Sequence, residues 1–128
     1  MKEKFEKYKE LLERNGDIKQ KRKDHCQIIE ELYDENITQI ENSGKPIVGK
    51  QVLLEMENQN LDGVKSVKTK INEIVFDNKS EKVWGQMTIN FDSKKNGKKR
   101  LEEAFIQKWS NGKIIYQRFF YGEMINED

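Results

Sequence analysis

The stretch KVWGQMTINFDSKKNGKKRLEEAFIQKWSNGKIIYQRFFY (residues 82–121) contains three segments in which apolar and polar side chains alternate. Alternation with a period of two is typical of strands that bury one face, and the two Asn-Gly steps between the segments supply the positive φ angles of tight hairpin turns. Together with the segment before it, this stretch predicts a meander of four antiparallel strands: 65–76, 82–92, 99–109 and 113–124. In the last turn we expect Gly112 to adopt a positive φ.

The same alternation predicts which side chains of each strand face the core. On the second strand of the meander the inward set is Val83, Gly85, Met87, Ile89 and Phe91. On the third it is Leu101, Glu103, Phe105, Gln107 and Trp109, and on the fourth it is Ile115, Gln117, Phe119 and Tyr121. The opposite face of the fourth strand is apolar as well, so we expect both faces of the sheet to be covered.

Helical spacing dominates the chain before the meander. A first helix is predicted by the stripe of Phe5, Tyr8, Leu11 and Leu12, and Asn15-Gly16 is suited to end it. A second helix carries on one face His25, Ile28, Ile29, Leu32 and Tyr33. A short strand at 37–41 and a turn around Pro46 then precede a third helix over 49–61. Helices followed by an antiparallel meander predict an α+β fold.

Composition limits the possible classes of protein. A chain of 128 residues predicts a single domain spanning 1–128, and a net charge of +1 provides neither the like-charge excess of a disordered chain nor the basic surface of a nucleic-acid-binding protein. No apolar segment is long enough for a signal peptide or a membrane span, so we expect a cytoplasmic protein with no nucleic-acid or membrane partner. Because His25 and Cys26 are the only histidine and cysteine, we predict no disulfide, no metal and no cofactor.

Three short motifs, LYDENIT (32–38), PIVGK (46–50) and WSNGKII (109–115), occur in this order between the helices and the last hairpin. In order and spacing the chain resembles SnoaL-like members of the nuclear-transport-factor-2-like superfamily, which includes ketosteroid isomerase, scytalone dehydratase and polyketide cyclases. The resemblance covers roughly residues 25–124. It implies a cone-shaped cystatin-like fold, in which N-terminal helices pack in a curved antiparallel β-sheet and leave a pocket open at one end.

The resemblance also implies candidate catalytic residues. Alignment through Thr38 places Glu41 where the isomerase has its carboxylate base, and a low-dielectric pocket would raise its pKa. The chain departs from the family elsewhere, because Phe105 stands at the position of the hydrogen-donating carboxyl and Tyr8 is one residue away from the family tyrosine. The multi-histidine and His–Asp sites of relatives have no counterpart beside the single His25.

Glu103 is the second catalytic candidate, because it lies on an otherwise apolar strand face. Such a carboxylate either lines the pocket or pairs with a donor such as Arg100 or a glutamine, since an unpaired buried charge is costly. If Glu41 and Glu103 reach one cavity, we expect at least one of them to have a raised pKa, so that one carboxyl is protonated near neutrality. In the alternative, Glu41 lies in solvent and both carboxyls have ordinary pKa values.

These assignments predict a small-molecule ligand and a homodimer. The remaining predicted pocket residues are Tyr33, Met87, Phe105, Gln107, Trp109, Gln117, Phe119 and Tyr121. The predicted dimer interface, on the opposite sheet face, is Trp84, Thr88, Ile106, Tyr116 and Phe120. We predict a pocket protein that binds a small apolar or carbonyl-bearing metabolite and, if it is an enzyme, isomerises or cyclises it by proton transfer. The alternative is a non-catalytic dimerisation or protein-interaction module with a vestigial pocket.

Overall fold

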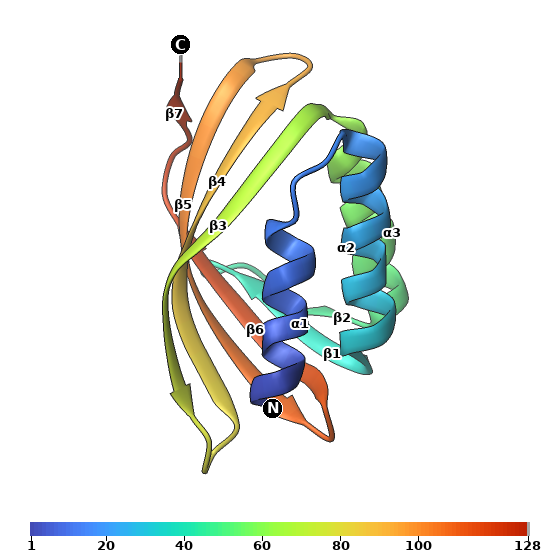
Figure 1. Ribbon diagram of the computed structural model, residues 1–128, viewed down its shortest axis with the longest axis vertical. Helices are drawn as coiled ribbons and strands as arrows, with labels where there is room; N and C mark the ends of the chain where they lie inside the picture. Colours follow the sequence, from blue (N-terminus) through green and yellow to red (C-terminus); the bar gives the residue numbers. More distant parts are fainter. Residues whose placement is uncertain (128) are drawn as a thin grey trace.

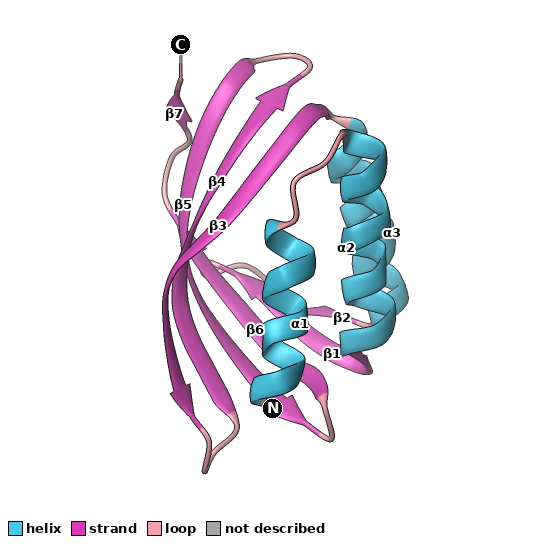
Figure 2. Ribbon diagram, in the orientation of Figure 1, coloured by secondary structure: helices cyan, strands magenta, loops and turns pink. Residues whose placement is uncertain are grey.

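The computed structural model describes residues 1–127, and in this part of the chain three helices lie on the concave side of one strongly curved sheet (Figures 1 and 2). The elements in chain order are α1 (Lys2–Glu13), α2 (Ile18–Leu32), β1 (Tyr33–Glu41), β2 (Ile47–Val48), α3 (Lys50–Asp62), β3 (Val64–Asp77), β4 (Lys82–Ser93), β5 (Gly97–Ser110), β6 (Lys113–Tyr121) and β7 (Ile125–Asn126). Helix α1 packs against α2 and β3, and α2 packs against α3. The predicted α+β fold with helices inside a curved sheet is therefore confirmed.

The strands run in the spatial order β2-β1-β6-β5-β4-β3, and β7 pairs with β5. The meander β3 to β6 is antiparallel, as predicted, whereas β1 lies parallel to β6. The short strands β2 and β7 were not predicted, and β6 ends at Tyr121 rather than at residue 124. The predicted place of Tyr33 on the second helix is wrong: its backbone is already extended, with ψ at 135°, and β1 begins there rather than at residue 37. Strand β7 follows β6 and pairs with the part of β5 that β6 does not reach, where Ile125 lies opposite Arg100. Among the described residues no helix is long and apolar enough to cross a membrane.

Local sequence signals account for the ends of two elements. In the β5–β6 turn Asn111 and Gly112 have φ angles of 52° and 74°, as a two-residue hairpin loop requires, which confirms the prediction for Gly112. Asp17 is the N-cap of helix α2, and its side chain accepts a hydrogen bond from the backbone N–H of Gln20 at 2.9 Å. This turn and this cap set the register of the last hairpin and the start of the second helix.

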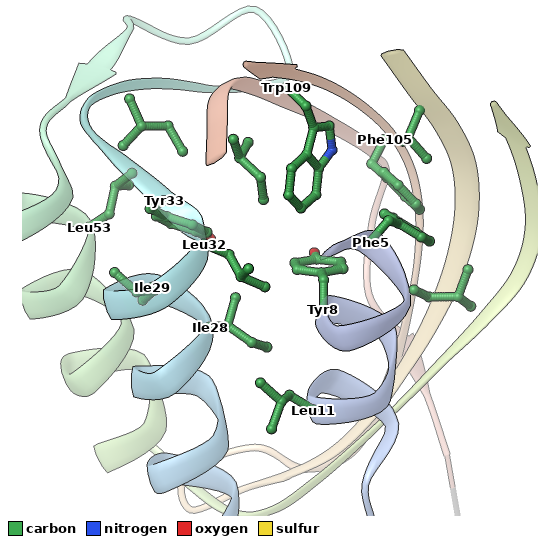
Figure 3. Close-up of a cluster of buried hydrophobic side chains, with 14 of the residues drawn as sticks. Phe5, Tyr8, Leu11, Ile28, Ile29, Leu32, Tyr33, Leu53, Phe105 and Trp109 are labelled. Carbon is green, nitrogen blue, oxygen red and sulfur yellow. The ribbon is translucent and has the colours of Figure 1, made fainter. Parts of the chain in front are cut away.

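The closed core joins α1 and α2 to the sheet around Phe105 and Trp109 (Figure 3). The Phe5 ring stacks on Phe105 with their centroids 6.4 Å apart and meets Phe76 edge-on at 5.4 Å. The predicted inward faces of β4 and β5 are confirmed, with Val83 and Met87 nearly unexposed and every second residue of β5 from Leu101 to Trp109 buried. Aromatic packing of α1 on these faces therefore closes one end of the cone.

The predicted inward position of Ile115 is wrong. A register shift between Lys108 and Trp109 places Ile114 opposite Trp109, so that Ile114 is fully buried while Ile115 is 39% exposed. A bulge adds one residue to one strand of a pair, and beyond it each side chain changes face. The alternation that correctly places Gln117 therefore fails on the hairpin side of the bulge.

Candidate functional site

A cavity of about 460 Å³ lies between the helices α2 and α3 and the concave face of the sheet. The helical wall is mainly apolar and includes Ile28, Ile29 and Leu53, and the sheet wall includes Met87, Ile89 and Leu101. The exposed Met124 also lines it, just after the end of β6. A cavity of this volume with apolar walls suits a small organic molecule.

The structure divides the predicted pocket residues into two groups. Tyr33, Met87, Phe119 and Tyr121 line the cavity, as do Glu41 and Glu103. The others, Phe105, Gln107, Trp109 and Gln117, are at most 3% exposed and do not line it. The side chains of α1 explain the difference, because Phe5 and Tyr8 fill the end of the cone where Phe105 and Trp109 point (Figure 3).

Glu103 lies on the sheet wall of the cavity and is only 9% exposed. Among residues 1–127 it forms no ion pair and no side-chain hydrogen bond, since Arg100 pairs with Glu127 instead, at 3.0 Å. Burial, and then the charges of Glu41 and Glu57, raise the pKa of Glu103 to about 7. A carboxyl with this pKa exists in both protonation states at neutral pH.

Glu41 differs from Glu103 because it has a hydrogen-bond partner. It ends β1 opposite Phe119 of the parallel strand β6, is half-buried, and accepts a 2.9 Å hydrogen bond from the Tyr121 hydroxyl. Tyr121 is in turn the β6 neighbour of Glu103. Burial, followed by the hydrogen bond to Glu41, raises the pKa of Tyr121 to about 12, so the phenol keeps its proton and remains a donor. Strand β1 thus holds Glu41, and strand β5 holds Glu103, on the two sides of Tyr121 on β6.

The helical wall adds two polar residues that the sequence reasoning missed. His25 is 8% exposed, its Nδ1 lies 3.8 Å from Glu57 Oε2, and its buried Nε2 has no hydrogen-bond partner within residues 1–127. Both residues line the cavity. The missed signal is helical spacing, because Leu53, Glu57 and Leu61 recur every four residues and share one face of α3.

The buried glutamines support the wall instead of facing the cavity. The Gln117 Nε2 group donates to the Tyr33 hydroxyl at 2.9 Å and to Gln39 Oε1 at 2.6 Å. The Gln107 side-chain oxygen accepts from Trp109 Nε1 at 3.2 Å. These bonds orient Tyr33 and Trp109, whereas Gln107 Nε2 and Gln117 Oε1 are buried without a hydrogen-bond partner among residues 1–127.

Metal binding has no support in the geometry. Among residues 1–127 no three His, Cys, Asp or Glu side chains stand close enough together to hold an ion. The cavity carboxyls come from three separate elements: Glu41 and Glu103 lie on strands β1 and β5 of the sheet wall, and Glu57 lies on α3 in the helical wall. This arrangement can take up or release a proton and can bind a polar group of a small molecule.

No protein-family model and no curated protein sequence matches this chain. Its structure is similar to that of an NTF2-like protein of unknown function from Exiguobacterium sp. 255-15, with a TM-score of 0.74 and 14% identity over 94% of this chain and 98% of the other. It is also similar to the structure of a protein from Jannaschia sp. CCS1 that is assigned to the SnoaL-like polyketide cyclases. The TM-score is 0.72, and the identity is 11% over 94% of this chain and 85% of the other. A third similar structure is that of an LEH-like epoxide hydrolase from M. tuberculosis, with a TM-score of 0.71 and 12% identity over 94% of this chain and 76% of the other.

Proposed function

We propose, from the NTF2-like fold that these structures share with this chain, that the protein binds a small, largely apolar molecule in its cavity, with Glu103 as the polar anchor. The observation that carries this proposal is the unpaired Glu103 carboxyl in an apolar cavity. An unpaired buried carboxyl costs stability, and a ligand group that hydrogen-bonds to it offsets that cost. The solved structures named above as a polyketide cyclase and an epoxide hydrolase are consistent with a small-molecule pocket.

Proton transfer is the chemistry that Glu103 and Glu41 would supply in this proposal. A group with a pKa of about 7 both accepts and donates a proton at neutral pH, which is what a general acid–base residue needs. Glu41 would help to keep the pKa of Glu103 near neutrality, because its negative charge contributes to the raised pKa. The Tyr121 hydroxyl in turn holds Glu41 in place through its hydrogen bond. The substrate of such a reaction would carry an ionisable C–H or O–H group beside its apolar part.

Thermal-shift screening with small aromatic and alicyclic alcohols, ketones and amines tests the binding proposal. We expect at least one class to raise the melting temperature, with a stabilisation that grows with ligand concentration as RT ln(1 + [L]/Kd). In Ile89→Trp the larger side chain would occupy the cavity and abolish the rise. The matched variant Asn90→Trp, at the next and outward-facing position, should keep it. A wild-type protein that responds to no class, or an unchanged response in Ile89→Trp, would contradict the proposal.

The outer face of the sheet supports a second role, in self-association. Val75, Trp84 and Ile106 are neighbours across β3, β4 and β5, and Trp84 is 52% exposed. Phe120 is 40% exposed on β6, where the Arg118 guanidinium lies 4.7 Å from its ring centroid. Apolar side chains gathered on one outer sheet face are typical of an interface, and we propose that Trp84, Thr88, Ile106, Tyr116 and Phe120 form a homodimer contact.

Ile106→Glu tests the dimer. We expect the wild-type protein to sediment as a dimer and the variant as a folded monomer, because the change would bury like charges near a two-fold axis. Val52→Glu, at an exposed apolar position on α3, is the control and should remain dimeric. Sedimentation of the wild type as a monomer at tens of micromolar would rule out this contact.

A further inference from the structure

The cavity is acidic, and among residues 1–127 its walls contain no lysine or arginine, only His25 beside Glu57. Glu41, Glu57 and Glu103 line it. The whole chain has 24 lysines and arginines, nearly balanced by 23 acidic residues. The charge imbalance is therefore a property of the cavity and not of the protein. Inside low-dielectric walls, three carboxyls with a single histidine, which faces Glu57, as their basic neighbour favour a positively charged occupant.

The partners of the three carboxyls differ. Glu41 accepts a hydrogen bond from Tyr121, and Glu57 faces His25 Nδ1 at 3.8 Å. Glu103, more than nine-tenths buried, has neither an ion pair nor a hydrogen bond within residues 1–127. Its oxygens are thus free to accept from a ligand, on the sheet wall that faces the apolar helical wall.

We propose that the ligand is an amphiphilic amine, whose ammonium group binds Glu103 while its hydrocarbon part fills the apolar remainder of the cavity. This inference rests on the proposed function and names the class of its ligand. An ammonium group fits better than a metal ion, because within the described chain the cavity carboxyls do not converge on one point as metal ligands do. It has three N–H donors that point in different directions, and carboxylates accept such charge-assisted hydrogen bonds strongly.

A cationic ligand is also compatible with the proton transfer proposed above. Removing a proton from a neutral molecule creates an anion, which Glu41 and Glu57 would repel. A ligand that carries its own positive charge compensates for that anion. Its ammonium also favours the ionised form of Glu103, which is the form that accepts charge-assisted hydrogen bonds from the ligand.

Amine affinity should depend on pH through Glu103. The ionisable groups that face this carboxyl are Glu41 on β1, Tyr121 on β6, Glu57 on α3, His25 on α2 and Tyr8 on α1. The phenols stay protonated because burial raises the pKa of Tyr8 and of Tyr121. Since Glu103 changes from mostly protonated to mostly ionised between about pH 6 and pH 8, the affinity for the amine should rise about tenfold over this range.

Three probes of matched size test the inference by calorimetry and methyl NMR: 4-phenylbutylamine, 4-phenylbutan-1-ol and 4-phenylbutyrate. At about pH 8 we expect the amine to bind roughly tenfold or more tightly than the alcohol, and the carboxylate to bind most weakly. In Glu103→Gln the preference for the amine should be lost while alcohol affinity is kept. Glu102→Gln is the matched control, since Glu102 is the adjacent, exposed residue of β5, and it should behave as the wild type.

The outcomes separate the two proposals. An alcohol that binds the wild type as tightly as the amine overturns the amine inference and leaves the binding function standing. A preference for the amine that survives in Glu103→Gln overturns the assignment of Glu103 as its anchor, and so does an affinity that is the same at the two pH values. If none of the three probes enters the cavity, the amine inference fails, and the thermal-shift screen described above decides the proposed binding function.

Discussion

Glu103→Gln is expected to stabilise the folded protein at alkaline pH and to leave its stability unchanged in acid. The pKa of Glu103 is raised from 4.5 to about 7 in the folded state, so folding favours the protonated form. The protonated carboxyl contributes its full stability below a pH of 4.5, which is the ordinary pKa and that of the unfolded chain. This contribution is lost as the pH rises through about 7, the pKa in the folded protein. A neutral glutamine has no such dependence. The variant should therefore exceed the wild type by roughly 3 kcal/mol in free energy of unfolding at about pH 8.

Urea unfolding at several pH values measures this difference, which should vanish below about pH 5. Glu102→Gln removes the same charge from the exposed face of β5 and should leave the pH dependence of the wild type intact. Carbon-detected NMR of the glutamate carboxyls adds a direct reading, in which one carboxyl titrates near neutrality and disappears in Glu103→Gln. If all carboxyls titrate in the ordinary range and the two stability curves run parallel, the proton-transfer proposal is wrong.

Gly85→Ala is expected to destabilise the fold strongly although it adds one methyl group. A Cβ atom at Gly85 would lie 2.5 Å from the carbonyl oxygen of Glu73 and 2.6 Å from the Phe105 ring. Both distances are far below contact distance, and the Phe105 ring is held by its stack on Phe5. Relief requires a shift of the β3–β4 backbone and of the core ring, at about 3 kcal/mol, a large part of the stability of a small domain.

Thermal or urea unfolding of Gly85→Ala measures this loss, and Gly122→Ala is the control because nothing lies within 4 Å of its added Cβ. In a double-mutant cycle, Phe105→Leu should recover part of the loss, since it removes the ring that the new methyl group meets. A Gly85→Ala protein as stable as the wild type would show that β4 can move away from Phe105. In that case the closed end of the cone would be less rigid than its packing indicates.

Several features of the fold were predictable because they depend on neighbours in the chain. Alternation correctly predicted the inward set of β5, including the polar Glu103 and Gln107, because side chains of a strand must alternate between faces. The Asn-Gly step predicted the turn at Gly112, since few residues tolerate its positive φ. Ile115 marks the limit of this reasoning, because a bulge moved Ile114 inward and no local pattern signals a bulge.

The amino-acid sequence by itself thus determined the helices, the meander and the side of the sheet on which each candidate carboxyl of β5 lies. Only the tertiary structure decided which inward residues meet a cavity. Helix α1 fills the end of the cone around Phe105 and Trp109 and leaves Glu103 beside open space, while α3 brings Glu57 and α2 brings His25 to the opposite wall. Burial, the charges of Glu41 and Glu57, and the lack of a cation depend on distances between segments far apart in the chain. Periodicity is a local property, whereas the pKa of Glu103 depends first on its burial by other elements and then on the charges of Glu41 and Glu57.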